Sequence, residues 1–180
     1  MSILKVARIG HPVVRAVARA VEKGAFRDRL FQKLVDDMRE TMHDYEGVGL
    51  AAPQVHESLR LAVIEVPGSE DRSEAEVPFM VLANPVITPM DEEREPGWEG
   101  CLSVPDLRGT VPRLKRLKLD ALDRHGKPYS LEASGFFARV IQHECDHLDG
   151  HVYLDRMADL RSLTFIKEFE EHVKKDEDES

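Results

Sequence analysis

The sequence predicts an α+β fold, because strand-like segments occupy the middle of the chain and helix-like segments occupy its beginning and its end. A chain of 180 residues with 42% hydrophobic and 33% charged residues has the length and composition of one folded domain. We expect this domain to span residues 1–173. The run 174–180 contains no apolar residue and is expected to be an acidic, disordered tail.

The first helix is predicted from about Asp28 to Tyr45. Apolar residues recur there at four-residue spacing, which gives a helix one apolar face. Two glycines follow and are expected to end the helix and open a loop. The apolar positions are Leu30, Leu34, Met38 and Met42, widened by Phe31 and Val35, and the glycines are Gly47 and Gly49.

Short strands are predicted next, over residues 61–66, 79–83 and 86–88, with Asn84-Pro85 between the last two. The charged, serine-rich stretch 67–76 is expected to lie on the surface. Farther along, alternating polar and apolar residues, a turn and a returning strand predict a hairpin; these are residues 115–123, 123–126 and 129–133.

Two more helices are predicted in the last third of the chain. The first begins after Ser134, a suitable N-cap, and stops at Asp149-Gly150. The second runs from about Asp159 to Lys174 and carries apolar residues at helical spacing. The chain is therefore expected to have an N-terminal helix, a middle region of strands and a C-terminal helix.

Charge and targeting signals limit the classes of function. A net charge of −9 argues against nucleic acid as the main partner. One basic cluster alternates with leucines and is interpreted as a solvated strand edge; its members are Arg113, Lys115, Arg116 and Lys118. No apolar run is long enough to span a membrane, and the first residues do not resemble a signal peptide. We therefore expect a cytoplasmic protein.

The third predicted helix contains an H-E-x-x-H motif. His143 and His147 lie four residues apart, so on a helix they are about 40° apart on one face and can bind one metal ion. Glu144 flanks this position, which suits a base acting on water. Three fixed residues also occur by chance, and the pair would then belong to an ordinary solvated face. Phe136, Arg139 and Val140 project on the same side and weaken that alternative.

Two cysteines and a glycine-rich segment complete the candidate site. Cys145 is about 200° around the helix from His143, so we expect it to be buried in the core and not to bind the metal. Cys101 lies between Gly100 and Pro105, and its chemistry leaves a metal ligand and a buried thiol equally open. Gln54 follows a Gly-x-Gly segment and could be an exposed polar residue or a donor to a developing oxyanion.

Together these segments resemble the peptide deformylase family. Its three motifs are matched, in the family order, by Gly47-Val-Gly-Leu-Ala-Ala-Pro-Gln54, Glu99-Gly-Cys-Leu-Ser103 and Gln142-His-Glu-Cys-Asp-His147. Asn84-Pro85, Val111-Pro-Arg113 and the predicted hairpin are also similar to the family. The resemblance extends from about Ile9 to the last predicted helix.

The resemblance implies the fold, the reaction and the role of each site residue. It implies antiparallel sheets packed around the motif helix, and removal of the formyl group from formyl-methionine at the start of new polypeptides, with release of formate. The implied metal ligands are Cys101, His143 and His147, and the implied catalytic groups are Glu144, Gln54 and the backbone N–H of Leu102. Residues expected to bind substrate are Val48, Gly49, Phe136, Arg139 and Val140, with Arg139 near the pocket entrance.

The implied cofactor is one divalent metal ion per chain, natively Fe(II), with Zn(II), Ni(II) or Co(II) as substitutes. The implied partners are N-formyl-methionyl peptides of nascent chains, with the ribosome as a further candidate. Two rivals share the H-E-x-x-H motif: a zinc metalloprotease that cleaves internal peptide bonds, and a metal-binding domain without catalytic activity. The protease needs neither Cys101 nor the first motif. The second rival, a domain descended from the enzyme, would bind metal without turnover, yet every expected catalytic residue is present.

Overall fold

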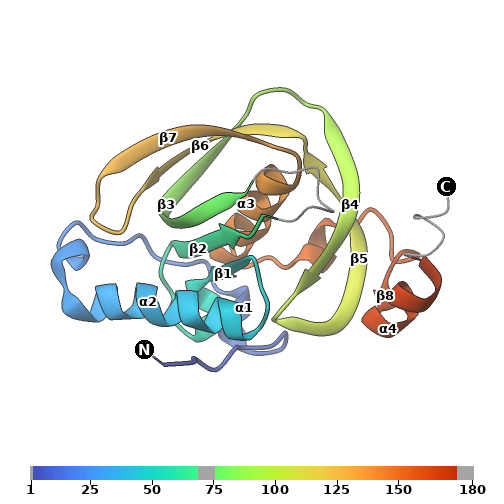
Figure 1. Cartoon of the computed structure of the whole chain (residues 1–180), viewed down its shortest axis with the longest axis horizontal. Coiled ribbons are helices and arrows are strands. Elements are labelled where there is room, and N and C mark those ends of the chain that lie inside the picture. Colours follow the sequence, from blue (N-terminus) through green and yellow to red (C-terminus); the bar gives the residue numbers. More distant parts are fainter. Residues whose placement is uncertain (1, 69–75, 174–180) are drawn as a thin grey trace.

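The computed structural model describes residues 2–68 and 76–173 as two antiparallel sheets and several helices. The five-stranded sheet has the order β1-β2-β3-β6-β7, and the three-stranded sheet has the order β4-β5-β8 (Figure 1). The strands are β1 Gly49–Ala51, β2 Leu61–Val66, β3 Val77–Pro89, β4 Arg94–Cys101, β5 Val104–Leu114, β6 Arg116–Leu122, β7 Pro128–Ser134 and β8 Thr164–Phe165.

The helices are short except for two. They are α1 Pro12–Arg15, α2 Arg29–Asp44, α3 Gly135–Leu148 and α4 Ile166–Glu168, with single turns at Ala25–Arg27, Ala52–Val55 and Tyr153–Arg156, and a π-helical turn at Phe169–Val173. The mixed α/β class with antiparallel sheets is as predicted. Among the described residues, none of these helices is long and apolar enough to cross a membrane.

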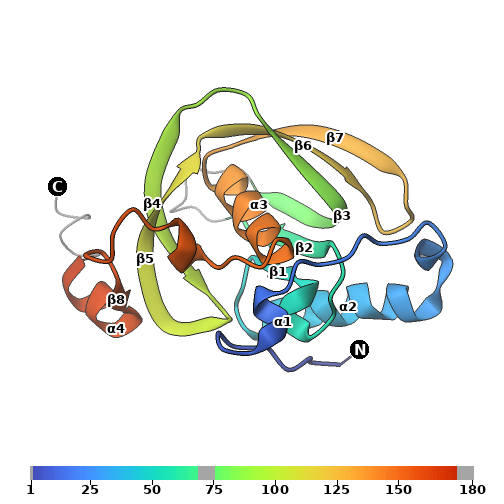
Figure 2. The same cartoon turned by 180° about the vertical axis from the view of Figure 1, so that it is seen from behind.

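The five-stranded sheet carries α2 on one face and α3 on the other. Strand β2 shows this most clearly, because Leu61 and Val63 belong to the core under α2, whereas Ala62 and Ile64 belong to the core under α3. Successive side chains of a strand point to opposite faces, so β2 is apolar at nearly every position. Helix α3 also contacts β5 and thereby touches both sheets; Figure 2 shows it from the other side.

Helix α2 begins and ends within one residue of the prediction, but its apolar face is rotated. Leu30 is 74% exposed, whereas Phe31, Val35, Met38 and Met42 are buried. A shift of one residue turns a side chain by about 100°, which takes Leu30 off the buried face. The residue in the left-handed conformation after the helix is Glu46, with φ 55°, and not one of the expected glycines.

Strand β3 is one continuous strand, and the predicted break at Asn84-Pro85 is wrong. The register between β3 and β6 shifts between Ala83 and Val86, which is a β-bulge. Asn84 adopts a φ of 51°, and its side-chain amide binds the backbone N–H and C=O of Val21. These two hydrogen bonds offset the unusual backbone conformation, so the strand continues through the proline. The predicted hairpin of β6 and β7 is confirmed.

The C-terminal helix begins later than predicted. Residues 159–163 form turns, and Thr164–Phe165 pairs with β5 before α4 starts at Ile166. Leu160, an expected member of the apolar face, is 66% exposed. The whole expected tail 174–180 and most of the expected surface stretch 67–76 lie outside the described residues.

Strands β4 and β5 were not predicted from the sequence. They form the longest antiparallel ladder of the three-stranded sheet, from Arg94–Leu114 to Cys101–Val104. Proline, glycine and charged residues interrupt any apolar alternation in β4, because much of what it buries is polar.

Candidate metal centre

Helix α3 brings two imidazoles to one side of the molecule. The rings of His143 and His147 lie 5.0 Å apart between centroids, one helical turn from each other. Nδ1 of His143 donates a hydrogen bond to Oε2 of Glu99 at 2.9 Å, which leaves Nε2 of this ring available. His147 is 1% exposed, and its Nδ1 has no hydrogen-bond partner among the described residues.

The thiol of Cys101 reaches the same place from the end of β4. Its Sγ lies 3.2 Å from Nε2 of His147, and one ligand atom from each of Cys101, His143 and His147 lies within 4.8 Å of the others. A thiol and two imidazoles suit Fe(II), Zn(II), Ni(II) or Co(II), and three protein ligands leave a coordination position open for chemistry. The donor set and its spacing therefore fit a catalytic metal ion.

The two cysteines have opposite environments. Burial alone would raise the pKa of the Cys101 thiol, but the facing imidazoles of His147 and His143 outweigh it and hold the pKa well below its usual value. The thiolate is the form that binds metals. Burial raises the pKa of Cys145 to about 12, and this residue packs in the apolar core under α3, as its helical position predicted.

Glu144 lies beside the imidazoles and is closely covered by β1. A Cβ atom placed on Gly49 would lie 2.3 Å from Oε1 of Glu144, so the backbone can approach the carboxyl group only at a glycine. Glu144 is 3% exposed, and its Oε2 has no partner among the described residues. Burial raises the pKa of Glu144 to about 7, so this group can both take up and release a proton near neutral pH.

Gln54 is held with its amide nitrogen toward the thiol. Its Oε1 accepts a hydrogen bond from the backbone N–H of Ala51 at 2.8 Å, and its Nε2 lies 3.3 Å from Oγ of Ser103 and 3.6 Å from Sγ of Cys101. Leu102 lies in the turn between β4 and β5, directly after Cys101. The amide of Gln54 and the turn at Leu102 thus border the same space.

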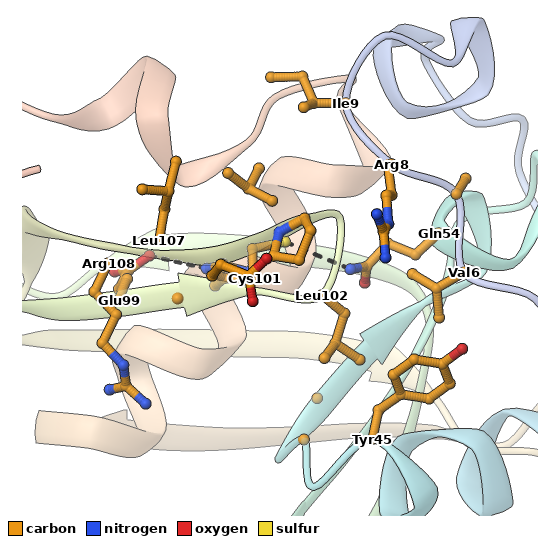
Figure 3. Close-up of a pocket in the computed structure, with 18 of the residues that line it drawn as sticks. Val6, Arg8, Ile9, Tyr45, Gln54, Glu99, Cys101, Leu102, Leu107 and Arg108 are labelled. Carbon is orange, nitrogen blue, oxygen red and sulfur yellow. Dashed lines mark hydrogen bonds and ion pairs between the residues drawn. The ribbon is translucent and has the colours of Figure 1, made fainter. Parts of the chain in front are cut away.

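That space is a cavity of about 1430 Å³. Figure 3 shows Cys101 and Gln54 within it, with Leu102 and Tyr45 on one side and Ile9 on another. The five residues predicted to bind substrate, Val48, Gly49, Phe136, Arg139 and Val140, all line it, together with His143 and Glu144. The volume exceeds what one amino-acid side chain needs, so there is room for several residues of a peptide.

A network of buried charges that was not predicted from the sequence supports the site. Glu99 accepts two hydrogen bonds from Arg113, at 2.8 and 3.0 Å, and Arg113 also binds Asp146 of α3 at 2.6 Å. Burial alone would raise the pKa of Glu99, but the hydrogen bonds from His143 and Arg113 outweigh it and lower the pKa to about 2. Glu99 therefore stays ionised and orients the His143 ring.

Arg113 and Arg139 are more deeply buried than the sequence suggested. Arg113 is 4% exposed, so placing it on a solvated strand edge is wrong; the β5 register turns its side chain inward toward Glu99. Arg139, expected near the pocket entrance, lines the cavity, and its guanidinium donates to Glu99 and to the backbone oxygens of Glu95, Gly97 and Val111. Glu99, two residues before Cys101, could have indicated that both arginines are buried, because a buried carboxylate needs cationic partners.

Comparisons with known proteins show which family the chain resembles. The sequence model of the Polypeptide deformylase family matches residues 3–162. The chain is 45% identical over 166 residues to peptide deformylase 2 of Pseudomonas putida, covering 92% of this chain and 93% of that protein. It is 44% identical over 164 residues to peptide deformylase 1 of Nitrosomonas europaea, covering 91% of this chain and 92% of that one.

Solved structures are similar as well. The class I type b peptide deformylase of Acinetobacter baumannii with Met-Ala-Ser bound superposes with a TM-score of 0.80 at 35% identity, over 87% of this chain and 100% of that one. The peptide deformylase of Thermotoga maritima superposes with a TM-score of 0.79 at 37% identity, over 88% of this chain and 100% of that one.

Proposed function

The chain belongs to the polypeptide deformylase family, and we propose that Cys101, His143, His147, Glu144, Gln54 and the backbone N–H of Leu102 form its catalytic centre. Members of this family are metal-dependent hydrolases that remove the N-formyl group from newly made polypeptides, and this chain is such an enzyme, releasing formate. One observation carries the assignment: the thiol and both imidazoles converge beside a buried carboxyl group at a cavity.

Cys101, His143 and His147 are the proposed ligands of one divalent metal ion per chain. Fe(II) is the proposed native ion, with Zn(II), Ni(II) and Co(II) as substitutes, and a thiolate ligand makes the site sensitive to oxidation. A divalent ion held there would polarise the formyl carbonyl and favour ionisation of the attacking water. Glu99 supports the site by fixing the tautomer and orientation of His143.

Glu144 is the proposed acid and base. Its carboxylate takes a proton from the water that attacks the formyl carbon, and it then gives that proton to the amine that leaves. Because burial raises the pKa of Glu144 to about 7, neither transfer is strongly uphill near neutral pH. Its place behind Gly49 shields it from bulk water.

Gln54 and the backbone N–H of Leu102 are the proposed donors to the formyl oxygen as negative charge develops on it. The bond from Ala51 to Oε1 of Gln54 supports this role, because it orients Nε2 toward the centre before substrate arrives. Loss of one such donor typically lowers the rate about 10²- to 10³-fold.

The proposed substrate is an extended peptide that begins with formyl-methionine. The methionine side chain would lie against Phe136 and Val140, and the peptide backbone would pair with Val48-Gly49. Strand β1 is at the edge of its sheet, which leaves one side available for an added strand. Arg139 also lines the cavity and is proposed to contribute to substrate binding by shaping the pocket, since its guanidinium is held by protein acceptors.

We place the reaction in the cytoplasm, where formylated chains emerge, with the ribosome as a further contact. In the proposed architecture, residues 1–173 form one catalytic domain whose sheets surround the motif helix α3.

The test is formate release from formyl-Met-Ala-Ser by the metal-loaded enzyme and its Glu144→Ala variant. Retained metal with formate release lowered by several orders of magnitude supports the roles given above. Unchanged release by the variant would exclude Glu144 as the acid and base. Cleavage of internal bonds in unformylated peptides would instead support a metalloprotease.

A further inference from the structure

The N-terminal strap, residues 2–9, runs from α2 to the cavity without forming a helix or a strand. Near its beginning, Leu4 packs against the core under α2, and farther along Ala7 is buried in the apolar core of the three-stranded sheet. Residues 5–9 line the cavity, and Figure 3 shows Val6 and Arg8 beside Gln54. The strap therefore connects the two sheets along one side of the site.

Two buried side chains of α2 hold the beginning of the strap. Thr41 is fully buried, and its Oγ1 accepts a hydrogen bond from the backbone N–H of Leu4 at 2.8 Å. The same hydroxyl donates to the backbone oxygen of Asp37 at 2.7 Å, which directs its lone pairs toward the strap. The carboxylate of Asp37 accepts a hydrogen bond from the backbone N–H of Ser2 at 2.9 Å. The strap is thus anchored to α2 by specific hydrogen bonds.

The far end of the strap binds the two segments that carry the proposed oxyanion donors. The N–H of Ala7 donates to the backbone oxygen of Gln54 at 2.7 Å, and the N–H of Ile9 donates to the backbone oxygen of Ser103 at 2.8 Å. Ser103 directly follows Leu102. In an extended chain, groups two residues apart point the same way and lie about 7 Å apart. One short piece of chain therefore sets the separation of the two segments.

Ser103 passes any displacement of its backbone to the site. Its Oγ accepts a hydrogen bond from Nε2 of Gln54 at 3.3 Å, and its own backbone N–H lies 3.4 Å from Sγ of Cys101. Ser103 and Gln54 are 0% and 2% exposed, so neither side chain has space to relax toward solvent. A shift of Ser103 would consequently move the Gln54 amide and the adjoining N–H of Leu102.

We propose that the N-terminal strap is a positioning element for the reaction. By holding the carbonyls of Gln54 and Ser103, it keeps the Gln54 amide and the Leu102 N–H at the separation that fits the formyl oxygen as charge develops. The inference rests on the proposed function, since it takes these two groups as the oxyanion donors. Donors that are fixed before substrate arrives stabilise developing charge without reorganisation, and a misplacement of about 1 Å can cost about 100-fold in rate.

A turn at the end of the strap allows one of these hydrogen bonds to be removed selectively. The N–H of His11 donates to the oxygen of Arg8 at 3.0 Å, Gly10 has a φ of 99°, and the φ of Ile9 is not positive. This is a type II turn with Ile9 at the second position, where proline is common. Ile9 is 42% exposed, so its side chain is not part of the core. Ile9→Pro should therefore preserve the turn and remove only the N–H that binds Ser103.

The experiment measures formate release from formyl-Met-Ala-Ser by the metal-loaded full chain and its Ile9→Pro and Ile9→Ala variants. Ile9→Ala loses the same side chain but keeps the N–H, so the difference between the two variants reports the hydrogen bond. We expect kcat to be about 5- to 20-fold lower in Ile9→Pro than in Ile9→Ala, because a partial loss of the strap displaces the donors by less than 1 Å. KM and metal content should be the same in both variants.

The anchor on α2 provides an independent test at the other end of the strap. Thr41→Val keeps the shape of the buried side chain but removes the acceptor of the Leu4 N–H, and it should lower kcat about two- to five-fold with metal content unchanged. Thr41→Ser keeps the hydroxyl and should restore most of the lost kcat. Leu82→Ala is the control for lost stability, because it weakens the core away from the strap, and it should keep the kcat of the unmodified chain.

A double variant shows whether the strap acts through the oxyanion donors. In a Gln54→Ala background, the change from Ile9→Ala to Ile9→Pro should lower kcat by a clearly smaller factor, because one of the two positioned groups is gone. The same factor in both backgrounds would overturn the inference, because the strap would then act independently of Gln54.

The remaining outcomes separate this inference from the proposed function. Equal kcat in Ile9→Pro and Ile9→Ala, or loss of metal from Ile9→Pro alone, would overturn the inference, while formate release by the unmodified chain upholds the proposed function. Absence of formate release from the unmodified, metal-loaded chain would overturn the proposed function and the inference with it.

Discussion

The two sheets meet at the metal centre but are held by different forces. The five-stranded sheet buries aliphatic side chains on both faces, between α2 and α3. The three-stranded sheet has a small apolar core and is joined to α3 by buried charges, in which Glu99 and Arg113 link β4 and β5 to Asp146. The five-stranded sheet supports the site through apolar packing. The three-stranded sheet carries Cys101 and, through Glu99, orients His143.

The two sheets should respond differently when a buried side chain is replaced. Aliphatic packing tolerates small changes of shape at a cost that grows with the cavity left behind. A buried ion network tolerates substitution poorly, because removal of one charge leaves its partners buried and unpaired. Damage to the five-stranded sheet should therefore lower stability alone, and damage to the charge network should lower stability and metal affinity together.

The largest effect is expected from Glu99→Gln. This change leaves Arg113 and Arg139 without their shared carboxylate, which typically costs about 3–5 kcal/mol in the free energy of unfolding. It also removes the acceptor that orients His143, so metal affinity should fall about 10- to 100-fold. Urea unfolding and competition with a chelator measure the two effects. Glu95→Gln, at an exposed position of the same strand, is the control and should change neither.

Leu82→Ala should destabilise the protein by about 3 kcal/mol, because Leu82 is fully buried in the core between the five-stranded sheet and α3. Metal affinity measured in the folded protein should remain as in the unmodified chain. A loss of affinity as large as that of Glu99→Gln would show that the two sheets do not differ in the way described.

Acid should weaken the charge network in a defined pH window. The pKa of Glu99 is lowered to about 2 in the folded protein, from an ordinary value of 4.5. A lowered carboxyl pKa contributes stability that is complete above the ordinary value and is lost as the pH falls toward the folded value. Urea unfolding of metal-free protein should therefore show a steeper loss of stability from pH 4.5 to 2 than in Glu99→Gln. Parallel pH profiles would contradict this.

The smallest effect is expected from Leu30→Ala. Leu30 is 74% exposed on α2, so its truncation removes little buried surface and should change the free energy of unfolding by less than about 0.5 kcal/mol. Phe31→Ala, one residue along, should cost several times more because Phe31 is buried in the core under α2. Similar losses from both would contradict the observed orientation of the helix.

The same contrast explains what could be predicted from the sequence. Helices α2 and α3, strand β2 and the β6–β7 hairpin bury apolar residues with a regular period, and their positions were predicted to within a residue or two. Strands β4 and β5 were not predicted, because their residues are chosen for contacts with distant partners. Gly97 leaves space for Arg139, and Glu99 forms an ion pair with Arg113. Bulges such as that at Asn84 depend on distant contacts and leave no local period.

In the candidate site, too, residues close in sequence could be predicted and residues brought together by the fold could not. His143, Glu144 and His147 share one helical turn, so their spacing alone indicated metal chemistry. Cys101 and Gln54 reach that turn from other elements, so the residues alone left their roles open, and the resemblance to a family favoured one alternative for each. The residues that orient these groups, above all Glu99 and Arg139, became visible only in three dimensions.

The most direct test of the metal centre is the metal content per chain after anaerobic purification of three proteins: the unmodified chain, Cys101→Ser and Cys145→Ser. We predict about one ion per chain for the unmodified protein and for Cys145→Ser, and far less for Cys101→Ser, because only the Cys101 thiol faces both imidazoles. Full metal content in Cys101→Ser, or equal loss in both variants, would contradict the proposed centre.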